Sequence, residues 1–224
     1  MTQLLVNEVF QSIQGEGNYT GVPSIFLRLQ GCPVGCPWCD TKHTWTVDDK
    51  KISNADIVMR ERHESENYFS ASTAQLFDLF KQEHYTARHI VITGGEPCMF
   101  DLRPFTGAAI AHDFTVQIET SGTFEILCHE DAWITLSPKI NMPGGREVLS
   151  TAVTRANEIK HVVAMQKHLD ELNALLQNAS GQHTALIYLQ PVSMQARATE
   201  FAIQSCIKNN WRLSLQTHKF IGIE

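Results

Sequence analysis

Residues 32–41 read CPVGCPWCDT and place Cys32, Cys36 and Cys39 within eight positions. The stretch directly follows residues 24–30, SIFLRLQ, in which aromatic and β-branched residues alternate with polar ones and predict a strand. Thiolates at this spacing can point at one centre, and soft thiolates select zinc, copper(I) or iron-sulfur clusters. A structural zinc site is usually closed by four protein ligands, whereas three cysteines leave one metal position open. We therefore expect a 4Fe-4S cluster with one reactive iron after this strand.

Composition limits the class of protein. The chain has 224 residues, of which 43% are hydrophobic, and we expect one domain over its whole length. A net charge of −6 provides no basic excess for phosphate backbones, so we expect a small-molecule substrate and no direct contact with nucleic acid. Residues 1–8 lack the features of a signal peptide, and no long apolar run occurs, so we expect a cytoplasmic protein without membrane contact.

The remaining cysteines are scattered along the chain. A cytosolic protein keeps its thiols reduced, which favours burial or metal binding over disulfides. Free cysteine is among the most buried residue types. We therefore expect Cys98, Cys128 and Cys206 to lie in or near the core.

A regular alternation of strands and helices predicts the fold. Strands are expected to begin near residues 89, 115, 133, 159, 186 and 213, with helical segments between most of them. This is the rhythm of βα units in a parallel sheet. A full eight-fold barrel needs about 250 residues, so we predict an α/β fold of the partial, shortened (β/α) barrel type. A doubly wound open sheet is the alternative, and in both folds a ligand lies at the carboxyl ends of the strands.

Several less regular segments carry weaker predictions. Residues 45–70 are rich in charge and predict an inserted, exposed element with one helix near residues 54–63. Ser72 with Gln75 predicts a capping box at a helix start. We also expect a helix over residues 146–157 and a last strand over residues 213–216.

The run Gly94-Gly95-Glu96-Pro97 follows a predicted strand. Its two glycines allow the backbone to approach a ligand closely, and Glu96 offers a carboxylate to a ligand ammonium group. Such a run alone is more often a plain turn, and its significance comes from the cysteine loop. Trp38 could stack on a ligand ring or serve as a core or lid residue.

The motifs together resemble one family. They are residues 10–17 (FQSIQGEG), 26–32 (FLRLQGC), 38–41 (WCDT), 94–97 (GGEP), 119–122 (ETSG), 137–139 (SPK) and 217–219 (THK). This set resembles the 7-carboxy-7-deazaguanine synthase family of the radical S-adenosylmethionine superfamily. The resemblance runs nearly end to end except over residues 45–70, although some members of the family have a longer gap between the first two cysteines.

The resemblance implies a reaction and its cofactors. A deoxyadenosyl radical derived from S-adenosylmethionine would drive the ring contraction of 6-carboxy-5,6,7,8-tetrahydropterin to 7-carboxy-7-deazaguanine, with release of ammonia. The cofactors would be a 4Fe-4S cluster, S-adenosylmethionine and Mg²⁺, and the product would enter 7-deazapurine and queuosine biosynthesis. The resemblance also implies a homodimer and an electron donor such as flavodoxin.

The resemblance further implies roles for residues at matching positions. The cluster ligands would be Cys32, Cys36 and Cys39, with Thr41 as a magnesium ligand. S-adenosylmethionine would contact Trp38, Cys39, Asp40, Gly95, Glu96, Ser137, Pro138, Lys139 and Gln190. The pterin would contact Ile13, Gln14, Gly15, Glu16, Arg28, Thr93, Glu119 and His218.

These roles suit the chemistry of the side chains. The carboxylates of Glu16 and Glu119 can accept hydrogen bonds from the donor-rich edge of a pterin. Arg28 suits the substrate carboxylate, and its alternative role is an ion pair on the sheet face. A structural role at a strand end is the alternative for His218. Magnesium prefers hard oxygen ligands such as the hydroxyl of Thr41.

Two other functions fit parts of the pattern. A radical activase acting on a partner protein would share the cysteine loop but would not need Glu16, Arg28 and Glu119. A zinc-stabilised binding module would use Cys98 or a histidine as a fourth ligand.

Overall fold

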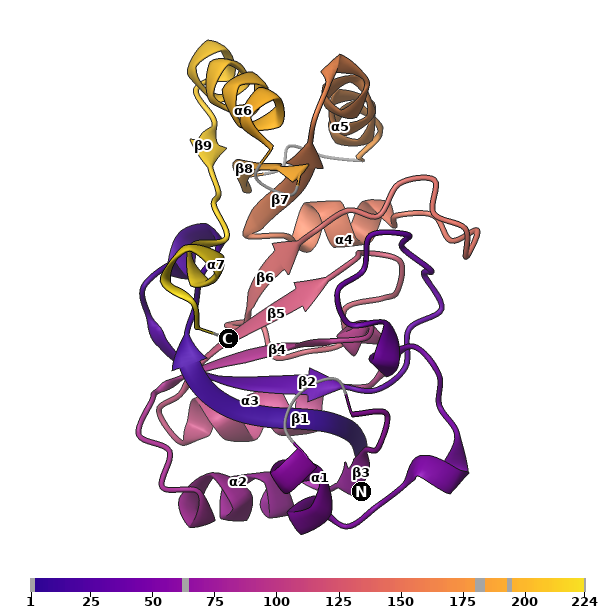
Figure 1. The fold of residues 1–224 in the computed structure, drawn as a ribbon, viewed down its shortest axis with the longest axis vertical. Coiled ribbons are helices and arrows are strands. Elements are labelled where there is room, and N and C mark those ends of the chain that lie inside the picture. The colour runs from indigo at the N-terminus through magenta and orange to yellow at the C-terminus, as the bar shows by residue number, and fades with distance from the viewer. Residues whose placement is uncertain (1–2, 62–64, 180–183, 193–194, 224) are drawn as a thin grey trace.

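The computed structural model describes residues 3–61, 65–179, 184–192 and 195–223, and the chain folds around one long sheet (Figure 1). The strand order among these residues is β3-β1-β2-β4-β5-β6-β7-β8-β9. β1 pairs antiparallel with β2 and β3, and the neighbours from β2 to β9 are parallel. The strands are β1 (Leu4–Ile13), β2 (Pro23–Leu29), β3 (Phe69–Ala71), β4 (His89–Gly94), β5 (Thr115–Thr120), β6 (Trp133–Leu136), β7 (Glu158–Val163), β8 (Leu186–Pro191) and β9 (Arg212–Leu213). This is the predicted partial (β/α) barrel, with β3 and β9 at the two ends of the order.

Helices follow most of the parallel strands, as the alternating pattern predicts. Figure 1 shows α1, α2 and α3 beside the strands at one end of the sheet and α4, α5 and α6 beside those at the other. The α-helices are α1 (Ala55–Glu61), α2 (Thr73–Gln82), α3 (Arg103–Ala111), α4 (Ser150–Arg155), α5 (Gln166–Asn178), α6 (Ala196–Asn209) and α7 (Thr217–Ile221). The predicted capping box at the start of α2 is present, with Ser72 and Gln75 each bonding the other's backbone. No helix among these described segments is long and apolar enough to cross a membrane.

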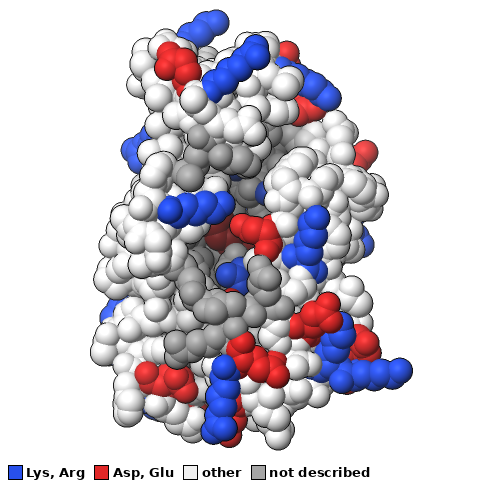
Figure 2. Space-filling model, in the orientation of Figure 1, with Lys and Arg blue, Asp and Glu red and all other residues white. Residues whose placement is uncertain are grey.

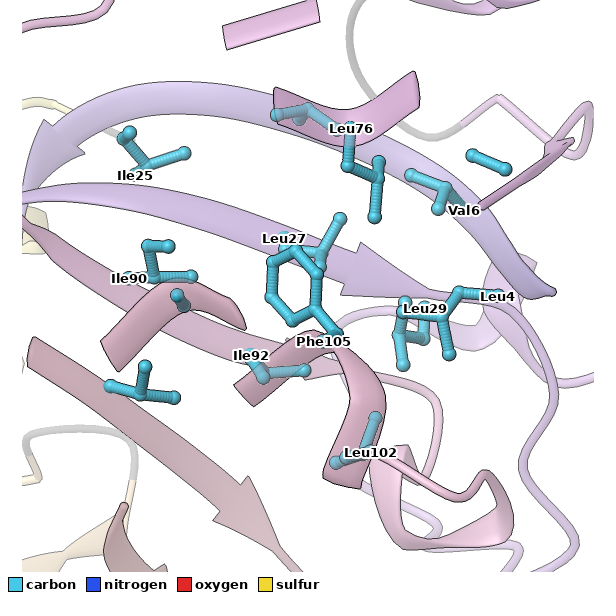
Figure 3. Packing of buried hydrophobic residues seen from close by; sticks show 14 of the residues in the cluster. Leu4, Val6, Ile25, Leu27, Leu29, Leu76, Ile90, Ile92, Leu102 and Phe105 are labelled. Atoms are coloured by element: carbon cyan, nitrogen blue, oxygen red, sulfur yellow. The ribbon is translucent and has the colours of Figure 1, made fainter. Parts of the chain in front are cut away.

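Alternate residues of the central strands pack under the helices. Successive side chains of a strand point to opposite faces, so one set per strand meets the helices. On β2 and β4 these residues are Ile25, Leu27, Leu29, Ile90 and Ile92, all fully buried. They pack with Leu76, Leu102 and Phe105 from the helical side (Figure 3). A second cluster, which includes Ile159, Leu172, Leu189 and Ala202, continues the same face over β7 and β8. One continuous sheet runs through both clusters.

The other set of alternate residues gives the opposite face a polar character. On β4 and β5 it includes His89, Gln117 and Glu119, and on β6 and β7 it includes Thr135 and Lys160. Gln117 donates to Glu119 and to Thr135, and it accepts from His89 if that ring nitrogen carries the proton. Buried polar groups of this kind require partners. The polar face of the sheet is therefore a hydrogen-bonded network that ends at the carboxyl edge.

Two predicted elements are shorter than expected. The helix predicted over residues 146–157 is α4, which begins at Ser150 because the backbone N–H of Leu149 donates to the oxygen of Gly122 (2.8 Å). The last strand, predicted over residues 213–216, ends at Leu213. The chain then bends because Thr217 N–H donates to the oxygen of Gly15 (3.0 Å), and α7 begins there.

Residues 45–70 are also more integrated than predicted. The expected helix is present as α1, with residues 62–63 of the prediction outside the described part of the chain. However, Val58, Tyr68 and Phe69 are buried, and β3 adds an edge strand to β1. The Asn7 side chain donates to the backbone oxygens of residues 65 and 67. The prediction that this segment is exposed is therefore wrong for its end, residues 68 and 69.

The scattered cysteines lie largely as expected. Cys98 and Cys206 are buried, and Cys128 is half-buried against the main core.

Candidate active site

The cysteine loop leaves the end of β2 and is fixed at both ends by hydrogen bonds. Gly31 N–H donates to the oxygen of Thr44 (2.7 Å), and Cys32 N–H donates to that of Trp45 (3.0 Å). The buried amide of Gln30 donates to the oxygen of Thr46 (2.7 Å). These bonds hold the three cysteines over the carboxyl edge of the sheet.

The three thiols line one cavity of about 300 Å³, here called the cysteine cavity. Burial raises the pKa of Cys32 to about 11 and also raises that of Cys36. Thiols held neutral by burial become thiolates when they bind a metal. At Cys39, the indole N–H of Trp45 donates to Sγ (3.4 Å), which stabilises negative charge on that sulfur. The donor set therefore fits a thiolate-bound metal group.

The number of thiols suits a cluster. A structural zinc site is usually closed by four protein ligands. A 4Fe-4S cluster instead takes each thiolate on a different iron, and three thiolates leave one iron open. The three thiols of the cysteine cavity therefore fit a cluster with one open iron.

The turn after β4 packs directly on the start of the cysteine loop. Gly95 N–H donates to the oxygen of Leu29 (2.9 Å) and Glu96 N–H to that of Gly31 (2.8 Å). A Cβ on Gly95 would lie 2.1 Å from the Gly31 oxygen, so a side chain cannot fit. Glycine is required here because two backbones meet, and the turn then forms part of the cavity wall.

The Glu96 side chain joins this turn to the next strand end. It is 1% exposed, and its oxygens accept from Thr120 Oγ1 (2.6 Å), Ser121 N (2.8 Å), Ser121 Oγ and Cys98 N (3.0 Å). The predicted contact with a ligand ammonium would have to share a carboxylate with these four donors. The contacts give Glu96 a structural role that the sequence pattern did not reveal.

A second cavity, of about 250 Å³, adjoins the first and is called here the arginine cavity. Arg28 and His218 line it, with Thr93 directly beside Arg28 in the register of β2 and β4. Arg28 Nε donates to Glu8 Oε2 (2.8 Å), which is the ion pair foreseen as its alternative role. That pairing uses one nitrogen and leaves the terminal nitrogens of the guanidinium as further donors.

The two cavities share a wall of charged residues. Lys160 Nζ donates to Glu16 Oε2 and to Glu119 Oε2 (2.9 Å), and Glu16 also accepts from Gln216 Nε2 (2.9 Å). Figure 2 shows a hollow near the middle of the molecule in which acidic and basic side chains meet. Thr41 and Thr93 also line both cavities. Two ligands bound in these cavities would therefore be neighbours across this wall.

The cysteine cavity contains a second lysine. Lys139 Nζ donates to the oxygen of Ser137 (3.1 Å) and to its hydroxyl. Burial lowers the pKa of Lys139, so a ligand anion in this cavity would favour its charged form. Gln190 also lines this cavity and accepts from Ser214 Oγ (3.1 Å).

The structure brings the predicted site residues together. Within the described part of the chain, each of them except Pro138 lines one or both cavities. The cysteine cavity holds Cys32, Cys36, Trp38, Cys39, Gly95, Glu96, Ser137, Lys139 and Gln190. The arginine cavity holds Ile13, Gln14, Gly15, Arg28 and His218. Glu16, Asp40, Thr41, Thr93 and Glu119 line both. Trp38 is 55% exposed, so it lies at the rim and not in the core.

Sequence reasoning missed Lys160, Gln117 and Gln216. The first two occupy alternate positions of buried strands, where parallel sheets usually carry apolar residues. The available signal was polar residues at alternate positions, at 115, 117 and 119 in β5 and at 158 and 160 in β7. Gln216 carried no comparable signal, because its position depends on the bend before α7.

Comparisons with known proteins agree with this geometry. A family model described as "4Fe-4S single cluster domain" matches residues 13–123. The chain is 50% identical over 222 residues to 7-carboxy-7-deazaguanine synthase from Escherichia coli (strain K12), covering 99% of each chain. It is 46% identical over 219 residues to the synthase from Buchnera aphidicola subsp. Schizaphis graminum (strain Sg), covering 97% of this chain and 98% of that protein. The crystal structure of QueE from Escherichia coli matches with a TM-score of 0.93 and 49% identity, covering 95% of this chain and 93% of that one.

Replacing Glu96 tests its structural role. Glu96→Ala leaves buried donors on Cys98, Thr120 and Ser121 without an acceptor, and hydrogen bonds to charged groups contribute about 1.5–3 kcal/mol each. We expect the free energy of unfolding of the metal-free protein to fall by about 3 kcal/mol or more in urea titrations followed by circular dichroism.

Glu125→Ala is the matched control, because Glu125 is exposed and its carboxylate accepts from the Thr151 hydroxyl on the surface. Its loss should change stability by less than about 0.5 kcal/mol. Equal losses in the two variants would contradict the structural role of Glu96.

Proposed function

The chain belongs to the 7-carboxy-7-deazaguanine synthase family, and we propose that its adjoining cavities convert 6-carboxy-5,6,7,8-tetrahydropterin to 7-carboxy-7-deazaguanine with release of ammonia. The protein is a radical S-adenosylmethionine enzyme with a 4Fe-4S cluster and S-adenosylmethionine as cofactors. Its product serves 7-deazapurine and queuosine biosynthesis.

The observation that carries this proposal is the wall shared by the two cavities. S-adenosylmethionine fits the cysteine cavity, and the pterin fits the arginine cavity. The cluster, when bound, supplies the electron that cleaves S-adenosylmethionine. A radical formed in one cavity would therefore reach the pterin directly where the two cavities join, beside Glu16, Glu119 and Lys160. Short transfer within an enclosed site limits side reactions with water.

Side chains of the cysteine cavity would orient S-adenosylmethionine. Lys139 and Ser137 offer donors to its carboxylate, and Gln190 offers an amide on the opposite wall. Gly95 brings backbone groups close to the ligand, and Trp38 at the rim can cover its adenine ring.

The arginine cavity offers a complementary set of groups to the pterin. The carboxylates of Glu16 and Glu119 can accept from the donor-rich edge of the ring. The free guanidinium nitrogens of Arg28 would hold the substrate carboxylate at the other end. His218 packs against Gly15, where a Cβ would lie 2.4 Å from its Nδ1, and so closes the cavity beside Glu16.

Thr41 lies where magnesium could join the substrate to the protein. Its hydroxyl lines both cavities and is 3.5 Å from Cys39 Sγ. Mg²⁺ usually keeps several waters and binds through one or two protein or substrate oxygens. We propose that Thr41 and the pterin carboxylate supply those oxygens.

The proposal extends to assembly and electron supply. Family resemblance supports a homodimer, a cytoplasmic location and an electron donor such as flavodoxin. The exposed rim around Trp38 offers such a donor a place close to the cysteines.

Product formation tests the function. Anaerobically purified protein with a chemical reductant, S-adenosylmethionine and 6-carboxy-5,6,7,8-tetrahydropterin should form 7-carboxy-7-deazaguanine, identified by mass spectrometry. The Cys36→Ala variant should bind no cluster and form no product. Cys128 lies outside both cavities, so the Cys128→Ala variant should keep about four iron and four sulfide per chain. Wild-type protein that holds the cluster and forms no product would contradict the assignment.

Arg28→Ala tests the orientation of the pterin. Loss of a charge-assisted contact with the substrate carboxylate should raise KM for the pterin by about 10-fold or more. The Kd for S-adenosylmethionine, measured by equilibrium dialysis, should change by less than about 2-fold.

Arg103→Ala provides the comparison, because Arg103 makes a similar ion pair with Asp101 on the surface, at 2.7 Å. It should leave both constants unchanged. If Arg28→Ala weakens both ligands alike, the arginine does not have the assigned position.

A further inference from the structure

Lys160 places a buried cation in the wall between the two cavities. The residue lies on the polar face of β7, and its side chain is 7% exposed. Its Nζ contacts one oxygen of Glu16 and one of Glu119, although these residues lie 144 and 41 positions away in sequence. The proposed function uses both glutamates and gives the lysine between them no role.

The other oxygen of each carboxylate is also held. Gln216 Nε2 donates to Glu16 Oε1 (2.9 Å), and Gln117 Nε2 donates to Glu119 Oε1 (3.1 Å). An ionised carboxylate has about four lone-pair sites, so each oxygen can accept one more donor. One ammonium and two amides therefore orient both carboxylates while leaving them able to bind a ligand.

The net charge of Glu16, Glu119 and Lys160 matters for ligand binding as much as their positions do. Two buried carboxylates that share a site do not both ionise unless a cation compensates them. A protonated carboxyl group presents an O–H donor, which opposes the N–H donors of a pterin edge. With Lys160 in place, the wall keeps a net negative charge and accepts hydrogen bonds.

We propose that Lys160 is a positioning residue that aims Glu16 and Glu119 at the donor edge of the pterin and favours their ionised forms. The inference rests on the proposed function and adds to it a residue that controls when the site can recognise its substrate. Loss of the lysine would change the charge of the wall and leave S-adenosylmethionine binding in the neighbouring cavity largely intact.

Electrostatics at the wall support this role. Burial alone would raise the pKa of Glu16. The charge of Lys160, together with the hydrogen bonds from Lys160 and Gln216, outweighs the effect of burial and lowers this pKa to about 2. Burial raises the pKa of Glu119 to about 7, because Lys160 is opposed there by Glu16 and Glu158. Burial alone would lower the pKa of Lys160. The carboxylates of Glu119 and Glu16 outweigh the effect of burial and raise this pKa, so Lys160 stays protonated.

Other charged groups face the wall from each surrounding element. They are Arg28 on β2, Asp40 in the cysteine loop, Glu96 after β4, Lys139 after β6, Glu158 on β7 and His218 on α7. All of them are retained when Lys160 alone is replaced, so a change in pH dependence reports on the lysine.

The test measures Kd for 6-carboxy-5,6,7,8-tetrahydropterin between pH 6 and 9, using anaerobic holoenzyme. Binding to the wild type should strengthen as pH rises through about 7, where Glu119 loses its proton. Removal of the cation raises the pKa of both glutamates. Lys160→Met should therefore move the midpoint upward by about one pH unit or more and weaken binding about 10-fold at pH 7, with a smaller difference at pH 9.

Three further variants separate charge from shape. Lys160→Arg keeps the positive charge, so its midpoint should equal that of the wild type. Lys160→Gln introduces a neutral hydrogen-bond donor and should behave like Lys160→Met. The glutamine variant also replaces the methionine variant in the test if the latter does not fold. Lys167→Met removes a lysine paired with Glu171 on the surface (3.8 Å) and should change nothing. The same substrate is used with every variant, so its own protonation affects each measurement equally. A difference in midpoint pH between variants therefore comes from the protein.

The outcomes distinguish this inference from the proposed function. A uniform loss of affinity at every pH in Lys160→Met, or unchanged binding in Lys160→Gln, would overturn the role of Lys160 while wild-type binding and turnover stand. Wild-type holoenzyme that does not bind the pterin would overturn both.

Discussion

The structure depends on the alternation of apolar and polar side chains along its parallel strands. Ile25, Leu27, Ile90 and Ile92 face the helices, while their neighbours face the opposite side of the sheet. The first set buries apolar surface and stabilises the fold. The second set builds the hydrogen-bonded network that reaches Glu119 and Lys160. Because parallel strands all end at one edge, the loops that follow β2, β4, β5 and β6 meet there and line the cysteine cavity.

Much of this arrangement could be predicted from local sequence. The starts of β4 to β9 fall within about one residue of the expected positions, because most of these strands are short segments with apolar residues at alternate positions, bounded by glycine, proline or polar residues. The cysteine loop and the Gly-Gly-Glu-Pro turn were placed by the same reasoning. Their closeness follows from topology: β2 and β4 are neighbours in the sheet, so the loops after them must touch.

The remaining features depend on contacts between distant segments. Lys160 contacts Glu16, which lies 144 positions away in the sequence, and no local sequence pattern predicts a contact between residues so far apart. The four donors around Glu96 come mainly from the end of β5, so its structural role could not be inferred from its own turn. The bend after β9 likewise exists because Thr217 bonds to Gly15. Burial of Tyr68 and Phe69 at the end of a charged segment also required the position of β1.

The assigned function depends on Cys32, Cys36 and Cys39, which would hold a 4Fe-4S cluster in the cysteine cavity with one iron left open for S-adenosylmethionine. Electron paramagnetic resonance of the chemically reduced holoenzyme, frozen with and without S-adenosylmethionine, tests this claim most directly. We expect S-adenosylmethionine to change the g values of the reduced cluster, because the ligand would reach the open iron. A reduced-cluster spectrum that S-adenosylmethionine leaves unchanged, in protein shown to bind it, would mean that the cysteine site leaves no iron open to the ligand.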